Sequence, residues 1–373
     1  MEEFSLKRQM EILNFNDEKR REWEKARLPY SALFELTARC NMNCVHCYLQ
    51  KHHTEVELSL EEIKGIIDIL YDKGILFLTL TGGEIFTRKD IAEIYMYAKR
   101  RGFMIELFTN GLALTDEMIE ILVRYPPVMV DISIYGACEE TYSKVTGING
   151  AFSKVMDNCR KLKAANVRFC LRTPVLTLTI GELDDMRELA NEIGTDLAIS
   201  YEISPTIDRD MISQNYQLDT RTVLELEVRD FFENEGIKDT AVSPLPDGGP
   251  KPIFSCKMGR GALVIDYTGK LFPCMKFRHI GQKLTRTNYD DLWASFGKYS
   301  ELMTKPDNKC NKCSAAYYCE VCPAEMDFIF GDMEYRTEDN CKIAFFIKDL
   351  HDNVFPSVQE ALVTLDKLFG STK

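Results

Sequence analysis

The stretch Cys40-Asn41-Met42-Asn43-Cys44-Val45-His46-Cys47 carries three thiols in a Cys-x₃-Cys-x₂-Cys pattern. This spacing lets three sulfurs converge on one loop, as thiolates that bind one face of an iron–sulfur cluster must do. A fourth cysteine would complete the ligation of a cubane cluster, whereas three leave one iron with an open position. The apolar run at residues 33–37 predicts a buried strand directly before the loop. A structural zinc loop and a set of buried thiols are the alternatives at this point.

The composition is that of a large, acidic, soluble protein. At 373 residues the chain is long enough for a large core and two domains with terminal extensions. Its formal net charge of −12 argues against a nucleic-acid backbone as the main partner. The acidic N-terminus has no apolar region typical of a secretory signal, and the longest apolar stretch, residues 74–81, is too short to span a membrane. We therefore expect a cytoplasmic protein.

The chain has 13 cysteines, which in a reducing compartment suggest metal ligands before disulfides. Three of them form the loop at residues 40–47. We expect three others, Cys138, Cys159 and Cys170, to be small buried side chains. The remaining seven are confined to the last third of the chain: Cys256, Cys274, Cys310, Cys313, Cys319, Cys322 and Cys341.

Short apolar runs alternate with amphipathic segments from residue 31 to residue 205. The runs predict strands at 33–37, 76–80, 103–108, 128–134, 167–173 and 197–203. The segments between them predict helices near 59–73, 88–101, 114–124, 150–165 and 181–193. This alternation predicts an α/β fold with a parallel sheet and right-handed crossovers.

A Cys-x₃-Cys-x₂-Cys loop after a first strand resembles the signature of the radical S-adenosylmethionine (SAM) superfamily. The resemblance implies a partial (β/α)₆ barrel, similar to a TIM barrel, with the active site at the C-terminal ends of the strands. It also implies that Cys40, Cys44 and Cys47 are catalytic and hold a 4Fe–4S cluster whose open iron chelates SAM. One-electron reduction of SAM would then give a 5′-deoxyadenosyl radical that abstracts hydrogen from the substrate.

Two polar loops after later strands fit this resemblance. Thr81-Gly82-Gly83-Glu84 follows the second strand, where glycines allow a close backbone approach and a carboxylate can take up an ammonium group. In the superfamily the matching Gly-Gly-Glu binds the amino group of SAM. Asn110, in Thr109-Asn110-Gly111 after the third strand, lies where relatives line the SAM pocket. The alternative for this turn is a cap on the next helix.

The fourth and fifth strands add further candidates. The segments Ser133-Ile134-Tyr135-Gly136, Glu140-Thr141-Tyr142 and Thr146-Gly147 resemble a pattern of peptide-modifying superfamily members. This resemblance implies that Ser133 lies near the SAM ribose and carboxylate. Arg172 on the fifth strand points at the same end of the barrel and could pair with the carboxylate. His46 occupies the position where the superfamily usually has an aromatic residue against the adenine, and Tyr48 beside it could equally be part of the core.

The C-terminal cysteines resemble the SPASM domain, a seven-cysteine extension named for peptide-maturing radical SAM enzymes. A predicted β-hairpin at residues 262–272 carries Cys274, five residues after Gly269. The run Cys310-x₂-Cys313-x₅-Cys319-x₂-Cys322 departs from the family in its last pair, which is usually Cys-x₃-Cys. The resemblance implies an outer auxiliary 4Fe–4S cluster on Cys310, Cys313, Cys319 and Cys341, and an inner one on Cys256, Cys274 and Cys322. A zinc ribbon is the alternative.

Two absences bear on the expected chemistry. Two cubane clusters have eight irons, and this region offers seven cysteines, so one inner position is open or has a ligand other than cysteine. An open iron could bind a substrate thiolate, which favours thioether cross-linking. Met275 stands where sulfatase-maturing relatives have an acidic base, which disfavours oxidation of a serine or cysteine to formylglycine.

We therefore expect five segments, and a peptide maturase as the function. The peptide substrate would acquire a thioether or C–C cross-link, and electrons would come from a flavodoxin or ferredoxin. The short N-terminal extension leaves no room for a leader-binding module, so a separate leader-binding protein is a candidate partner. The alternatives are radical chemistry on a small molecule, such as tetrapyrrole side-chain decarboxylation, and a non-catalytic iron–sulfur redox protein. The expected segments are an N-terminal helical extension at 1–30, the barrel at 31–205, a linker at 206–252, the SPASM domain at 253–345 and a C-terminal helix at 346–373.

Overall fold

The structure of the chain is a computed structural model that describes residues 15–49, 57–233, 248–352 and 354–370. The chain divides into two compact units. Unit 1 comprises Met1–Gln217 and Lys257–Lys298, and unit 2 comprises Leu218–Cys256 and Tyr299–Lys373.

Unit 1 is built on a sheet of nine strands among the described residues, in the order β6-β5-β4-β3-β2-β1-β7-β8-β9. Strands β1 to β6 run parallel, each paired with the next in sequence. They lie close to the predicted positions, so the predicted α/β fold with a parallel sheet is confirmed. These six strands are β1 (Ser31–Thr37), β2 (Phe77–Gly82), β3 (Met104–Thr109), β4 (Met129–Ser133), β5 (Phe169–Pro174) and β6 (Leu197–Ser200).

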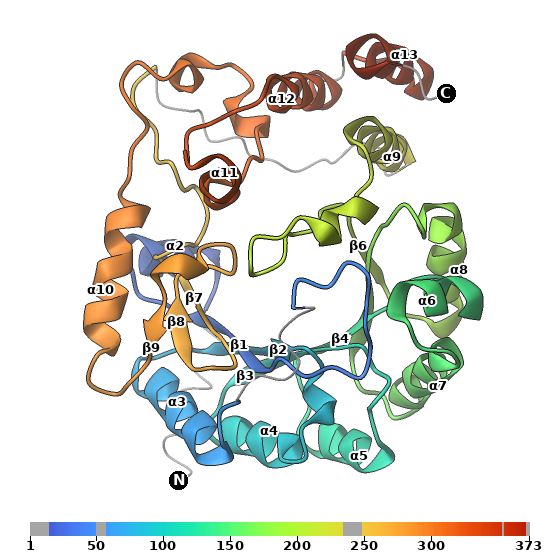
Figure 1. Cartoon of the computed structure of the whole chain (residues 1–373), viewed down its shortest axis with the longest axis vertical. Helices are drawn as coiled ribbons and strands as arrows, with labels where there is room; N and C mark the ends of the chain where they lie inside the picture. Colours follow the sequence, from blue (N-terminus) through green and yellow to red (C-terminus); the bar gives the residue numbers. More distant parts are fainter. Residues whose placement is uncertain (1–14, 50–56, 234–247, 353, 371–373) are drawn as a thin grey trace. The chain divides into compact units, whose positions relative to one another are not determined.

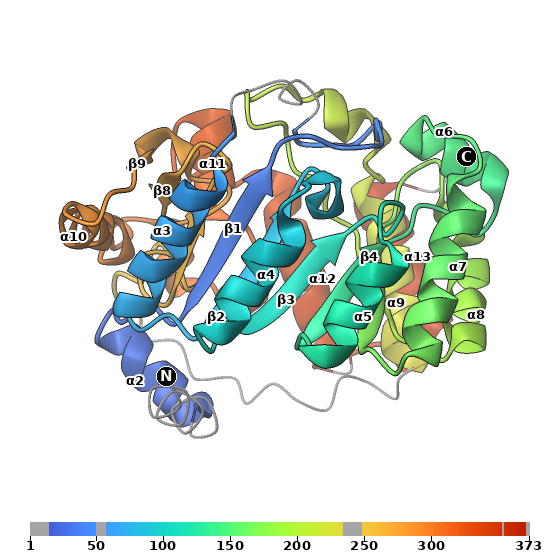
Figure 2. The same cartoon turned by 90° about the horizontal axis from the view of Figure 1, so that it is seen from below.

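Helices cover the outer face of this sheet, as Figures 1 and 2 show. Successive side chains of a strand point to opposite faces, and those that face the helices are apolar and fully buried, such as Phe34 on β1 and Leu107 on β3. The opposite, inner face carries polar groups, including Glu35, Glu106 and Asp131. The covering helices are α3 (Leu60–Asp72), α4 (Ile91–Arg100), α5 (Asp116–Arg124), α7 (Ala151–Ala164) and α8 (Leu183–Ile193).

The predicted hairpin belongs to the same sheet as the barrel. Strands β7 (Ala262–Ile265) and β8 (Lys270–Phe272) pair antiparallel, as expected, and β9 (Gln282–Lys283) continues the sheet. In addition, β7 pairs in parallel with β1, with Ser31 opposite Ala262 and Phe34 opposite Ile265. The segment that carries Cys274 is therefore part of unit 1.

Three helical features differ from the expectation or add to it. Helix α6 (Glu139–Thr146) follows β4 and was not predicted. The single helix expected at 346–373 is wrong: α12 (Glu338–His351) ends before Pro356, and α13 (Val358–Phe369) begins with Ser357 as its N-cap. At the N-terminus, α2 (Asp17–Lys25) is capped by Asn16, and residues 1–14 of the expected helical extension lie outside the described residues.

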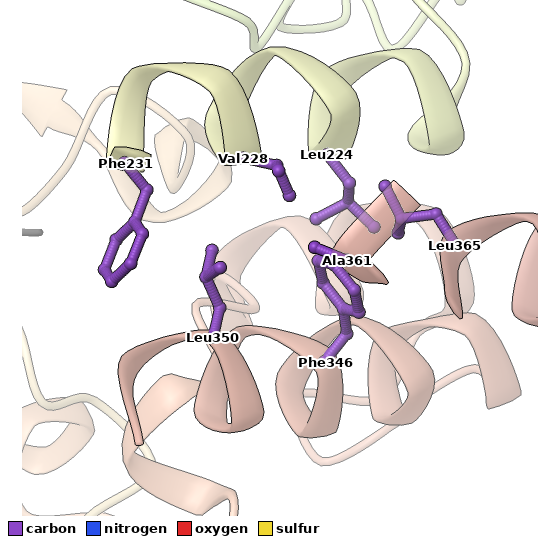
Figure 3. Close-up of a cluster of buried hydrophobic side chains, with 7 residues drawn as sticks. All are labelled: Leu224, Val228, Phe231, Phe346, Leu350, Ala361 and Leu365. Atoms are coloured by element: carbon purple, nitrogen blue, oxygen red, sulfur yellow. The ribbon is translucent and has the colours of Figure 1, made fainter. Parts of the chain in front are cut away.

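Unit 2 has a small core of its own, made by three helices. Side chains of α9 (Thr220–Glu233) point toward α12 and α13 in Figure 3. Because Cys341 lies on α12, this core supports a predicted cluster ligand. Unit 2 also contains α11 (Pro323–Phe330), whereas most of α10 (Tyr289–Ser300) belongs to unit 1. The buried residues of the core are Leu224, Val228, Phe231, Phe346, Leu350, Ala361 and Leu365.

The helices of the described part of the chain are all too short or too polar to cross a membrane.

Replacement of Phe346 by alanine tests the core of unit 2. Phe346 is buried between α9 and α13, so Phe346→Ala should lower the free energy of unfolding by about 3–5 kcal/mol. The matched control is its neighbour Phe345, whose side chain is 46% exposed, and Phe345→Ala should change stability by no more than about 0.5 kcal/mol. Urea denaturation followed by circular dichroism measures both, and equal losses would contradict the assignment of this core.

Candidate active site

The loop of residues 40–47 follows the C-terminal end of β1, as predicted. Cys44 is buried, and Cys40 and Cys47 are partly buried. Backbone amides point at two of the sulfurs: Met42 N donates to Cys40 Sγ, and Leu49 N donates to Cys47 Sγ, both at 3.4 Å. Such bonds favour a thiolate over a thiol, as a metal ligand requires.

The three sulfurs lie close enough to repel one another as thiolates. Burial raises the pKa of Cys40 to about 11, and it also raises the pKa values of Cys44 and Cys47. The charges of Cys47 and Cys40 raise the pKa of Cys44 further. A positively charged iron–sulfur core would offset this cost, because ligand thiols lose their protons when metal binds. The chemistry of this donor set therefore fits the implied cluster.

The described residues contain no group of three or more His, Cys, Asp or Glu side chains arranged to hold a single metal ion. In a cubane cluster each cysteine binds its own iron, so its cysteine ligands do not converge on one ion.

The Gly-Gly-Glu segment braces the start of the cysteine loop. Gly83 N donates to the Thr37 carbonyl and Glu84 N donates to the Arg39 carbonyl, both at 2.8 Å. A Cβ atom on Gly83 would lie 2.6 Å from the Ala38 carbonyl oxygen and closer still to that of Arg39. Only glycine fits this approach, so the segment has a structural role that sequence reasoning did not assign.

The carboxylate of Glu84 is fully buried and accepts three hydrogen bonds. It accepts from Asn110 N at 2.6 Å, from Thr109 Oγ1 at 2.7 Å and from Phe86 N at 3.0 Å. These bonds join the ends of β2 and β3 beneath the cysteine loop. The predicted contact of Glu84 with the SAM amino group stays a prediction.

The end of helix α6 holds the middle of the cysteine loop. Asn43 N donates to the Thr146 carbonyl at 2.8 Å, and Val45 N donates to the Val145 carbonyl at 3.0 Å. The last carbonyls of a helix have no partner within the helix, so they are available to such a loop. Helix α6 ends at Thr146, with Gly147 as its C-cap, so its last carbonyls are free to accept these hydrogen bonds from the cysteine loop.

Asn110 contacts the cysteine loop directly. Its Nδ2 donates to Asn41 Oδ1 at 2.8 Å and lies 3.6 Å from Cys40 Sγ. The alternative that this turn caps the next helix is wrong, because Thr115 is the N-cap of α5. The predicted contact of Asn110 with SAM is untested, but its place beside Cys40 agrees with it.

Arg172 lies on the inner face of β5, opposite Ser133 in the sheet. Its Nε donates to the buried carboxylate of Asp131, and its guanidinium lies over the Phe108 ring at 5.2 Å. Among the described residues, no hydrogen-bond partner is recorded for its two terminal nitrogens, and the side chain is 45% exposed. That free edge has the shape to bind a carboxylate through two hydrogen bonds.

Sequence reasoning gave no role to Asp131, which orients Arg172, or to Glu106 beside it. Burial raises the pKa of Glu106, and the nearby Asp131 raises it further. Both residues could have been noticed from the sequence, because each is a charged residue within a strand that was predicted to be buried.

The remaining predicted SAM contacts gather around Tyr135. Its ring lies 5.0 Å from that of His46, and its hydroxyl lies near Cys44 and Ser133. Burial lowers the pKa of His46 to about 4, so the imidazole is neutral near pH 7. Its Nδ1 is buried and has no partner in the described part of the chain, which leaves it able to bond a ligand.

A second group of thiols forms in unit 2. Burial raises the pKa of Cys310, and the charge of Arg336 lowers it. The charges of Cys319, Cys313 and Cys341 also raise this pKa, so the four sulfurs lie near one another. They are the four cysteines predicted to hold the outer cluster. The side chain of Asn308 accepts from Cys310 N at 2.8 Å and donates to Glu334 at 2.6 Å, which fixes this turn.

The predicted inner set is divided between the units. Cys274 belongs to unit 1, whereas Cys256 and Cys322 belong to unit 2, so this ligand set stays a prediction. Among the three cysteines expected to be buried, Cys159 and Cys170 are buried. The expectation for Cys138 is wrong, because this residue, the N-cap of the unpredicted helix α6, is exposed.

The chain matches two known protein families, one over the first group of thiols and one over most of the second. Residues 34–190 match the radical SAM superfamily, and residues 256–323 match the iron–sulfur cluster-binding SPASM domain. The chain is a radical SAM protein with a SPASM domain.

The names of the relatives of this radical SAM protein belong to two kinds of biosynthesis, that of heme and that of a bacteriocin. It is 28% identical to an AdoMet-dependent heme synthase of Methanosarcina barkeri, over 79% of this chain and 90% of that protein. It is also 28% identical to the antilisterial bacteriocin subtilosin biosynthesis protein AlbA of Bacillus subtilis, over 79% of this chain and 67% of that protein.

The fold is shared with a solved structure. SuiB of Streptococcus suis bound to S-adenosylmethionine superposes with a TM-score of 0.68 at 15% identity, over 84% of this chain and 77% of SuiB. SuiB has also been solved with its precursor peptide SuiA, with a TM-score of 0.65. This likeness confirms the expected fold class, a partial barrel with a SPASM domain.

The variant Gly83→Ala tests the brace on the cysteine loop. The added methyl group must push residues 38–39 away, so this variant should lose the iron of the first cluster, about four irons per chain. Gly65→Ala is the control, because no atom lies within 4 Å of the new methyl group on α3. That variant should keep its iron and gain about 0.5–1 kcal/mol in stability. Unchanged iron in Gly83→Ala after anaerobic reconstitution would refute the brace.

Proposed function

We propose that this radical SAM protein modifies a ribosomal precursor peptide, forming a thioether or C–C cross-link. The observation that carries the proposal is the presence of two separate thiol groups, one at residues 40–47 and one at Cys310, Cys313, Cys319 and Cys341. The Gly-Gly-Glu brace and the free edge of Arg172 support a SAM site at the first group. A protein that only carries electrons needs no such site.

In this proposal each part of SAM has a partner on the chain. Cys40, Cys44 and Cys47 would hold the cluster whose open iron binds SAM. Arg172 and Ser133 would bind the carboxylate, Glu84 and the glycines the amino group, and His46 the adenine, with Asn110 at the edge of the pocket. The bound group would supply a carbon-centred radical that abstracts hydrogen from the substrate.

The auxiliary clusters would complete the electron balance. A cross-link removes two hydrogens from the peptide: the first leaves as a hydrogen atom, and the second as a proton and an electron. Cys310, Cys313, Cys319 and Cys341 would hold an auxiliary cluster that supplies an acceptor for that electron. If the inner cluster has an open iron, it would also bind a substrate thiolate, which favours a thioether.

Radical chemistry on a precursor peptide would require two protein partners, an electron donor and a protein that presents the peptide. A reduced flavodoxin or ferredoxin would supply the electron that starts each turnover. A separate leader-binding protein would present the precursor peptide. The name of the relative AlbA, a bacteriocin biosynthesis protein, supports a peptide substrate.

Decarboxylation of tetrapyrrole side chains is the second candidate function. The observation that favours it is the similarity to an AdoMet-dependent heme synthase, 90% of whose length is covered.

Two cysteine variants test the assignment of the thiol groups. Reconstituted protein should hold about twelve irons per chain, four in each of three clusters, whereas a content near four would refute the SPASM clusters. Cys44→Ala should abolish the release of 5′-deoxyadenosine from SAM, because it removes a ligand of the first cluster. Cys341→Ala should keep part of this release and lose turnover of substrate. Equal loss of 5′-deoxyadenosine in both variants would contradict the assignment of SAM cleavage to the first cluster alone.

The substrate class is tested by mass spectrometry of the products. A precursor peptide encoded beside the gene should lose two hydrogens when incubated with protein, SAM and a reductant, and the loss should disappear in Cys44→Ala. An iron-coproporphyrin incubated in the same way should be unchanged. Release of carbon dioxide from the porphyrin, with an unmodified peptide, would favour the second candidate instead.

A further inference from the structure

The turn after β8 is held against the first cysteine loop by a buried ion pair. We propose that Arg278, together with Glu35 and Tyr48, is a positioning group that fixes the auxiliary-cluster cysteine Cys274 relative to the loop of Cys40, Cys44 and Cys47. The inference rests on the proposed function, because it assumes that Cys274 holds a cluster. All of these residues belong to unit 1.

Glu35 provides the buried anchor. It occupies an inward position on β1, and none of its surface is exposed. Arg278 Nη2 donates to Oε1 at 2.6 Å and Nη1 to Oε2 at 3.0 Å, while the Tyr48 hydroxyl donates to Oε1 at 2.9 Å. A buried carboxylate needs such partners, and the planar guanidinium matches its two oxygens. The pair therefore has a single well-defined geometry.

The other side of Arg278 shapes the turn that begins at Cys274. Its Nε donates to the Met275 carbonyl at 3.1 Å, and its Nη2 lies 3.3 Å from Met275 Sδ. Phe277 N closes the turn by donating to the Cys274 carbonyl at 3.1 Å. The position of the Cys274 backbone thus depends on where Glu35 holds the guanidinium.

Cys274 has the local geometry of a cluster ligand. Lys276 N donates to Cys274 Sγ at 3.4 Å, from two residues further along the chain. Cys40 and Cys47 receive the same bond at the same distance, from Met42 N and Leu49 N. The turn therefore presents Cys274 in the way that the first loop presents two of its sulfurs.

The two cysteine loops are joined by a short route through side chains. Tyr48 directly follows Cys47, its hydroxyl bonds Glu35, and Arg278 bonds both Glu35 and the residue after Cys274. A purely stabilising role would not require this pair, because apolar residues of similar volume stabilise a core equally well. Its place between two cysteine loops favours a positioning role.

A second ion pair holds the same turn on its other side. Lys276 pairs with Glu202, just after β6, but the carboxylate is 60% exposed. Exposed pairs contribute little to stability, so this contact is the weaker of the two. The buried pair with Glu35 is the one that determines where Cys274 lies.

The experiment compares Arg278→Gln with Arg286→Gln, which removes an exposed ion pair with Asp72 in the same unit. Each variant is reconstituted anaerobically, and its iron content and the EPR spectrum of its reduced clusters are measured. Cys274→Ala is the reference, because its spectrum lacks the signal that depends on this ligand. We expect Arg278→Gln to lose about four irons and to resemble Cys274→Ala, while it keeps 5′-deoxyadenosine release. Arg286→Gln should match the wild-type protein.

Two further variants keep the test decisive. Arg278→Lys keeps the charge without the planar fork, so it should restore the auxiliary signal only in part. If Arg278→Gln does not fold, Tyr48→Phe decides, because it removes one hydroxyl and should shift the auxiliary signal. Wild-type iron content and spectra in Tyr48→Phe and in every folded Arg278 variant would overturn this inference alone. A wild-type protein with only about four irons would overturn the proposed function as well.

Discussion

Parallel pairing of β1 on both of its sides is the constraint on which both cysteine loops of unit 1 depend. On one side β1 pairs with β2, and the register carries Gly83 and Glu84 into contact with the backbone of residues 37–39. On the other side β1 pairs with β7, which starts the hairpin that ends at Cys274. The inner face of β1 adds Glu35, whose partners come from both loops. One strand thereby sets the positions of four cysteines.

The cysteine loop is ordered by contacts that need no metal. Gly83 and Glu84 hold the backbone just before the loop, at Thr37 and Arg39, while the terminal carbonyls of α6 and the side chain of Asn110 bond the loop itself. A site whose ligands are already in place loses less conformational freedom when its cofactor binds. The glycines of the Gly-Gly-Glu segment help to order the loop because they have no side chain that would clash with the backbone of residues 37–39. The close approach of these glycines to a ligand stays a prediction from the sequence.

Features with a local cause were predictable from the sequence. The strand–helix alternation of the barrel, the hairpin and the cysteine spacing depend on residues close together in the chain. The parallel pairing of Ser31 with Ala262 joins distant segments and leaves no periodic signal in either. Helix α6 was missed because its residues were interpreted only as a ligand motif. Asp131 and Glu106 were missed because the inner face of an open barrel is polar, whereas a buried strand is expected to be apolar.

The seven C-terminal cysteines are divided between the two units of the chain, and their spacing in the sequence does not predict this division. The four sulfurs of the outer set lie together in unit 2, where Asn308 and the core of α9, α12 and α13 support them. Cys274 is instead part of the barrel sheet, through β7 and β8. An outer cluster could therefore be lost without disturbing the barrel, whereas Cys274 is held by the same strand that positions the first loop.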